Sequence, residues 1–228
     1  MRRATSPAQQ VLALPFRGGA RRGAGRKPAG ERAGAPHVAR DAIRPSEPVH
    51  VTLRMAEHVW NLRSERSFRI IHAALVGVRQ AVGFRVVHFS VQGNHLHLIL
   101  EANGAGALAS GMRAISIRLA RGLNRMMGRK GPVLADRFHA HVLRTPAEVR
   151  NALRYVLGNF ESHAERRGEP RSTKGWVDPF SSAAAKAPRD AQPSLFFEAP
   201  TADAQGWLLR QGANVEPGGR SLRPRSDE

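Results

Sequence analysis

The sequence contains no cysteine, and this absence narrows the chemistry open to the protein. Disulfide bonds, zinc–thiolate sites and cysteine nucleophiles are all excluded. No apolar run approaches the roughly 20 residues of a membrane-spanning helix. The short apolar run 11–14 is interrupted at Pro15, which makes it a poor signal peptide. We therefore expect a cytoplasmic protein with no membrane partner.

Acidic residues are scarce as well. The chain of 228 residues has 18 Asp and Glu against 36 Lys and Arg, a formal net charge of +18. This excess predicts a polyanionic partner, most simply a nucleic acid. An anionic membrane surface is the alternative, but the chain shows no basic amphipathic helix with a Trp, Phe and Leu face.

Composition divides the chain into three parts. Residues 1–46 are rich in Arg, Gly, Ala and Pro without periodicity, which predicts a disordered basic arm, either a solvated linker or a contact for phosphates. Residues 47–182 hold the periodic segments and form the expected domain. Residues 183–228 contain only isolated apolar clusters, so we expect a loosely packed or disordered C-terminal tail.

The periodic segments alternate in type. Two-residue alternation predicts strands at 49–54, 84–91, 95–101 and 138–144, with a hairpin turn at 92–94. Apolar residues spaced by three and four predict helices at 66–82, at 106–128 and from 146 to about 167. Thr145, Pro146 and Glu148 form a good start for the last helix. The order predicts an α+β fold: a ferredoxin-like split βαβ unit with an antiparallel four-stranded sheet, helices on one face and an added C-terminal helix.

The segment 92–100 carries the first candidate site. In a strand, His95 and His97 point to one face, while Leu96 and Leu98 point to the other. Two imidazoles at this spacing can bind one divalent cation. Taken alone, they are more often ordinary residues of a polar face.

The last predicted helix carries the second candidate site. Its apolar stripe leaves Tyr155 and Asn159, four residues apart, on a different face. Tyr155 is the only tyrosine in the chain. Taken alone, it is most simply an amphipathic residue at the edge of the core, with its ring packed and its hydroxyl in water.

The helix 106–128 and the residue after it carry basic side chains away from the apolar stripe. A solvated basic face is one explanation, but the high net charge favours contacts with backbone phosphates for some of them. The candidate DNA-binding residues are Arg113, Arg118, Arg121, Arg125 and Arg129.

Taken together, these motifs resemble a known family. The sequence Asn94–His95–Leu96–His97 after a short turn is similar to the HUH motif (His, large hydrophobic residue, His). The helix with Tyr155 and Asn159 resembles the nucleophile helix of single-tyrosine HUH transposases, above all the REP-associated tyrosine transposases. Their segment commonly reads Tyr-x-x-x-Asn-Pro, whereas this chain has Phe160 in place of the proline. The resemblance covers about 48–182.

The resemblance implies a mechanism. Tyr155 would attack a phosphate of single-stranded DNA, form a 5′-phosphotyrosine intermediate and allow rejoining. A phenol is a weak nucleophile at neutral pH, because it ionises only near pH ~10. The resemblance implies that a divalent cation, Mg²⁺ or Mn²⁺, assists the reaction, with His95, His97 and Asn159 as the expected ligands. His139 and His141 fit less well, because Ala140 is small, and they are interpreted as ordinary polar-face residues.

The resemblance also implies a partner, a single-stranded DNA hairpin beside a short recognition sequence. Relatives act as homodimers with shared active sites or as monomers, so both arrangements stay open. A ferredoxin-like RNA or DNA binder without chemistry is an alternative, but strand 95–101 offers no aromatic residue for base stacking. A second alternative is a domesticated relic that binds hairpins without cutting them.

Overall fold

The computed structural model describes residues 42–45, 47–166, 176–185 and 200–214. Four strands form one antiparallel sheet in the order β2–β3–β1–β4. The strands are β1 (Val49–Arg54), β2 (Phe84–Val91), β3 (His95–Ala102) and β4 (His139–Val142). Helix α1 (Glu65–Val76) connects β1 to β2, and α2 (Ala105–Met126) connects β3 to β4. This confirms the predicted α+β fold with a split βαβ order.

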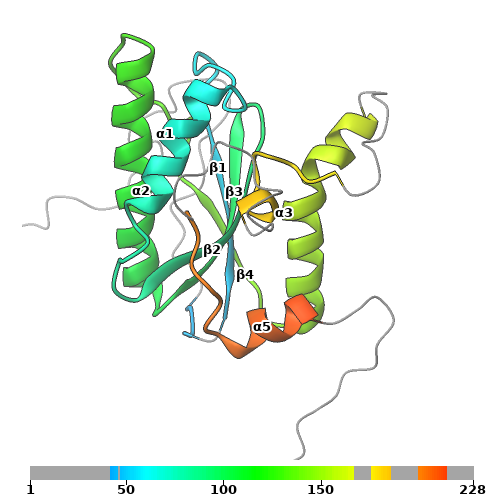
Figure 1. Ribbon diagram of the computed structural model, residues 1–228. Coiled ribbons are helices and arrows are strands. Elements are labelled where there is room, and N and C mark those ends of the chain that lie inside the picture. The colour runs from blue at the N-terminus through cyan, green and yellow to red at the C-terminus, as the bar shows by residue number, and fades with distance from the viewer. Residues whose placement is uncertain (1–41, 46, 167–175, 186–199, 215–228) are drawn as a thin grey trace, which may run out of the picture. The chain divides into compact units, whose positions relative to one another are not determined.

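Helices cover both faces of the sheet (Figure 1). Alternation along β3 sends Leu96, Leu98 and Leu100 into a core shared with α1 and α2. Ile99 points the other way, into a second apolar cluster with α3 (Pro146–Arg166) and α5 (Trp207–Asn214). The sequence predicted α1 and α2 on one face, and the structure adds that α3 occupies the opposite one.

Helix α1 is shorter than its apolar pattern predicts. The expected helix ran to residue 82, but α1 ends at Val76 with Gly77 as its C-cap. The pattern misleads because Val78 is buried from the turn that follows the helix, whereas Val82 is 98% exposed. An apolar residue at helical spacing therefore need not be helical when a turn can also place it in the core.

The segment 178–182 protects one edge of the sheet. Val91 N–H donates to the Phe180 carbonyl at 2.9 Å, and Ser90 forms an isolated bridge with Ser181. The short helix α4 (Ser182–Ala185) follows, and Ser182 Oγ accepts from Phe89 N–H. These contacts occupy backbone groups that edge strand β2 would otherwise expose.

Part of the C-terminal tail is packed, which differs from the expectation of a loose tail. Leu208 and Leu209 of α5 are buried against α3 and the sheet. The buried carboxylate of Glu101 accepts the backbone N–H groups of Gln205 and Gly206, at the start of α5. An acidic group at a helix N-terminus is electrostatically favourable. The basic arm lies outside the described residues except for 42–45, as do 186–199 and 215–228 of the tail.

Gly111 of α2 is expected to be intolerant of a side chain. A Cβ atom at this position would lie 2.3 Å from Cγ of the buried Phe84 ring. Gly111→Ala should lower the free energy of unfolding by about 1–3 kcal/mol through overpacking, despite the better helix propensity of alanine. Urea denaturation measures this change.

Gly106 provides the matched control on the same helix. A Cβ atom there meets nothing within 4 Å, so Gly106→Ala should leave stability equal or slightly higher. Equal denaturation midpoints for the two variants would show that the contact between Gly111 and Phe84 does not constrain α2.

Candidate active site

Two histidines of β3 lie on the sheet face that α3 covers. Strand alternation buries Leu96 and Leu98 on the opposite face, so His95 and His97 project together. Their ring centroids are 4.8 Å apart and the rings are perpendicular. His97 is only 3% exposed, whereas His95 is partly exposed beside Asn94, whose Oδ1 lies 2.8 Å from His95 Nδ1.

The neighbouring strand fixes the orientation of the His97 ring. Thr52 pairs directly with His97 across β1 and β3, and its Oγ1 lies 3.1 Å from His97 Nδ1. His50 Nε2 also lies 3.2 Å from His97 Nδ1. When His97 Nδ1 donates to Thr52, the other ring nitrogen, Nε2, keeps its lone pair, which is the form in which imidazole binds a metal.

Helix α3 brings Tyr155 to this pair. The helix runs over β2 and β3, and it buries its own Val149, Leu153 and Val156 against the sheet. The Tyr155 ring lies edge-on to His97, with centroids 5.1 Å apart. Its side chain is 48% exposed, so the ring is packed on one side and open to solvent on the other. The structure thus brings together three of the predicted site residues, which come from two separate elements.

The fourth predicted site residue, Asn159, lies one turn further along α3. Its side chain is outside the part of the structure that is described. Within the described residues, no three His, Cys, Asp or Glu side chains gather into a metal site. A metal on His95 and His97 would therefore need an amide, water or phosphate oxygen as a further ligand.

His50 is a site residue that the sequence reasoning missed. Its ring contacts both His97 and Tyr155, at centroid distances of 5.3 and 5.9 Å. Burial lowers the pKa of His50, and the nearby His141 lowers it further, which favours the neutral imidazole. The alternation of His50 and Thr52 in β1 was a possible signal, but only the strand register shows that they face His97.

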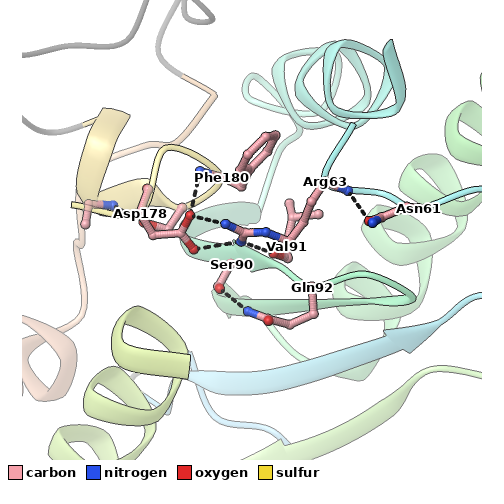
Figure 2. Close-up of polar contacts among 9 residues, drawn as sticks. Asn61, Arg63, Ser90, Val91, Gln92, Asp178 and Phe180 are labelled. Carbon is pink, nitrogen blue, oxygen red and sulfur yellow. Dashed lines mark hydrogen bonds and ion pairs between the residues drawn. The ribbon is translucent and has the colours of Figure 1, made fainter. Parts of the chain in front are cut away.

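An ion pair between Arg63 and Asp178, also missed by the sequence reasoning, lies at the end of β2 (Figure 2). Arg63 makes a bidentate pair with Asp178, at 2.8 and 3.0 Å, and donates to the Val91 carbonyl at the end of β2. The guanidinium also lies 3.8 Å from the centre of the Phe160 ring, on α3. Phe160 therefore joins α3 to the residue that holds 178–180 against β2.

The candidate DNA-binding arginines lie elsewhere. Helix α2 packs on the opposite face of the sheet from α3, the helix that carries Tyr155 (Figure 1). All five side chains are exposed, and Arg118 also packs over Gly77 of the α1 C-cap. Their contact with phosphates stays a prediction, and it concerns DNA away from the tyrosine. The set is Arg113, Arg118, Arg121, Arg125 and Arg129.

The second pair of histidines, on β4, shares the sheet face of the first. His139 pairs with Thr52 and His141 with His50 across β1 and β4, and both histidines are exposed. They do not come together with His95 and His97, because β1 separates β4 from β3.

The geometry defines a class of protein: a split βαβ sheet whose second face is covered by a helix that sets a tyrosine beside paired histidines. Among solved structures, the chain is similar to a REP-associated tyrosine transposase bound to a REP hairpin. The TM-score is 0.52 and the identity 18%, over 75% of this chain and 97% of that chain. The resemblance that the motifs predicted is confirmed at the level of the fold.

A lower similarity is found to a protein described as a transposase from Deinococcus radiodurans R1. Its TM-score is 0.35 and its identity 13%, over 61% of this chain and 99% of that chain, which is too low to define a shared fold. No protein-family model and no curated protein matches the chain. No helix in the described part of the chain is both long and apolar enough to cross a membrane.

Proposed function

We propose that this protein is a metal-dependent transposase that cleaves and rejoins single-stranded DNA through a 5′-phosphotyrosine intermediate on Tyr155. The observation that carries the proposal is the Tyr155 ring, half exposed and packed edge-on against His97 of the HxH strand. The tyrosine transposase fold of the similar structure supports it. A core-edge tyrosine alone would not require two histidines on the facing strand.

In the proposed cleavage step, each bond that forms is matched by one that breaks. The Tyr155 oxygen forms a bond to phosphorus and loses its proton, while the bond from phosphorus to the 3′-oxygen breaks and that oxygen gains a proton. Rejoining is the reverse attack by a 3′-hydroxyl, so no nucleotide cofactor is required. The position of Tyr155 on a packed helix aims the phenol, which lowers the entropic cost of reaching the in-line geometry.

The donor set on β3 fits Mg²⁺ or Mn²⁺. His95 and His97 would hold the ion, with His97 bound through Nε2 because Nδ1 is engaged by Thr52. Asn159 is proposed as a third ligand through its amide oxygen, since it follows Tyr155 by one helical turn. The ion would supply positive charge to the phosphate oxygens as negative charge develops on them.

A DNA hairpin is the proposed partner. The similar transposase is bound to a REP hairpin, and the net charge of +18 suits a phosphate backbone. A purely RNA-binding sheet is disfavoured, because such domains stack bases on the face of the sheet, whereas α3 covers β2 and β3 here. Whether a homodimer forms stays a prediction of the family resemblance.

A covalent-adduct assay tests the proposal. The protein is mixed with labelled single-stranded hairpin DNA from the flanks of its own gene, with Mn²⁺ or EDTA, and run on a denaturing gel. We expect a shifted protein–DNA band with Mn²⁺ and none with EDTA. Tight hairpin binding without any adduct would instead indicate the non-catalytic hairpin-binding relic.

Metal binding is expected to depend on the β3 histidines and not on the β4 histidines. His97→Ala removes a ligand and should weaken Mn²⁺ binding by at least 10-fold, measured by isothermal titration calorimetry without DNA. His139→Ala/His141→Ala provides a matched control with the same motif on the same sheet face. Equal Mn²⁺ affinity in wild type and both variants would show that His97 is not a ligand.

A further inference from the structure

Helix α3 covers one half of the sheet face that carries the site and leaves the other half largely uncovered. Among the described residues, α3 lies mainly over β2 and β3, and it reaches β1 through the contact of the Tyr155 ring with His50. Five side chains of β1 and β4 form the other half, which we call the β1–β4 shelf. They are Arg54, Thr52 and His50 of β1, with His139 and His141 of β4.

The register sets the order of side chains along the shelf. Arg54 pairs with His95 at one end, Thr52 lies between His97 and His139, and His50 pairs with His141 at the other end. The shelf from Arg54 to His50 covers five residues of β1, and the four steps between them give a length of about 13 Å at the rise of a strand. It therefore runs alongside the whole HxH motif.

The shelf is open and has a basic end. Arg54, His139 and His141 are exposed, while His50 and Thr52 are partly buried beneath Tyr155 and His97. At one end of the shelf, the carboxylate of Glu148 interacts electrostatically with His141, and its Oε2 accepts from the backbone N–H groups of Arg144 and Thr145. At the other end, beside His95, lies the guanidinium of Arg54.

The exposed edge of Tyr155 borders the shelf. Its ring contacts His50 of β1 as well as His97 of β3, so it stands at the boundary between the covered and uncovered halves of the face. A phosphate that reaches the Tyr155 hydroxyl must approach from the exposed side, and a strand carrying that phosphate would continue over β1 and β4. The α2 arginines cannot serve this part of the DNA, because they lie behind the sheet.

We propose that the β1–β4 shelf binds the single-stranded DNA segment next to the cleaved bond, with Arg54 contacting a phosphate and the rings of His139 and His141 contacting bases. This inference rests on the proposed function. Arginine pairs with phosphate oxygens, and histidine rings are among the side chains on which unstacked bases pack. These contacts require no particular sequence, since every base has a π-face. The β4 histidines thereby gain a role distinct from metal binding.

Binding of a short single strand tests the shelf. Fluorescence anisotropy with labelled (dT)12 compares wild type with His139→Gln/His141→Gln, which keeps polar side chains, and with Arg54→Ala. Each variant is expected to bind (dT)12 about 10-fold more weakly, as for loss of one stacked base or phosphate contact. A blunt-ended DNA hairpin without a single-stranded flank should bind all three proteins within twofold. Thermal melting confirms that the variants are folded.

The matched control is Arg66→Ala/Arg69→Ala on α1, two exposed arginines on the other face of the sheet, which should leave (dT)12 affinity within twofold. Unchanged (dT)12 affinity in both shelf variants would overturn the shelf, and so would equal weakening by the α1 control. Wild-type adduct formation is measured in parallel and separates this failure from failure of the proposed function. If the wild-type protein forms the adduct but the shelf variants bind (dT)12 as tightly as wild type, only the shelf is rejected. If the shelf variants bind (dT)12 more weakly but the wild-type protein forms no adduct, the shelf is supported and the transposase activity is rejected.

A second measurement locates the strand directly. A 12-mer containing 5-iodouracil is cross-linked to the wild-type protein, and the linked peptides are mapped by mass spectrometry. We expect links to peptides that contain Arg54, His139 or Tyr155. Links confined to α2 would overturn the shelf.

Discussion

Replacing Tyr155 by phenylalanine is expected to abolish the covalent DNA adduct while leaving the fold unchanged. The substitution removes only the hydroxyl, and the ring keeps its edge contacts with His97 and His50. Because the side chain is 48% exposed, the loss of its hydroxyl should change stability by less than about 0.5 kcal/mol. Adduct yield on a denaturing gel should fall by at least about 10³-fold, since no other group can form the same covalent link.

The chain offers a clean readout for this variant. Tyr155 is the only tyrosine in the sequence, so a phosphotyrosine linkage can be assigned to one position by mass spectrometry. Hairpin affinity, measured by anisotropy, should stay within about twofold of wild type, because the phenol does the chemistry and the basic surfaces do most of the binding. An adduct that persists in Tyr155→Phe would place the nucleophile elsewhere and reject the proposed mechanism.

Removing the charge of Asp178 is expected to cause the largest loss of stability. The Asp178 side chain is 3% exposed and that of its partner Arg63 14% exposed, and the two form a bidentate pair. Asp178→Asn would leave a largely buried guanidinium without a counter-charge, which typically costs about 3–5 kcal/mol. The Asp178 carboxylate also accepts a hydrogen bond from Phe180 N–H, so the contact of segment 178–182 with β2 should weaken as well. Urea denaturation measures the change in unfolding free energy.

An exposed aspartate provides the control for Asp178. Asp203 is exposed, and Asp203→Asn should change stability by less than about 0.5 kcal/mol. If Asp178→Asn were as mild as Asp203→Asn, the ion pair would contribute little and Phe160 would need another anchor. A large loss would show that the site depends on a contact outside its own chemistry, because Arg63 joins Phe160 of the tyrosine helix to the end of β2.

The two faces of the sheet differ in their side chains. The face toward α1 and α2 is apolar and supplies the core, while the opposite face carries the polar row of Ser90, His97, Thr52 and His139 across four strands. Helix α3 covers only half of that polar face. In the proposed function, the uncovered half is the side from which a DNA strand reaches Tyr155, and a fully covered sheet would block that approach.

The sequence alone determined the elements and the two motifs of the site. Alternation with period two placed His95 and His97 on one face of a strand, and the three-and-four pattern placed Tyr155 on a helix. These predictions succeed because strand and helix periodicities are local and depend on residues near in sequence. The same locality explains the error in α1, where Val78 continues the pattern from a turn.

Only the tertiary structure decided which side chains meet. Strand register, which depends on pairing across the whole sheet, put Thr52 and His50 against His97 Nδ1. The apolar residues Val149, Leu153 and Val156 of α3 are buried against the side of the sheet that carries Ile99. This packing places Tyr155 on that face and leaves the β1–β4 shelf open. Arg63 and Asp178 are 115 residues apart, and no local pattern could pair them. Such contacts are fixed by packing and charge in three dimensions, and the chemistry proposed for Tyr155 depends on them.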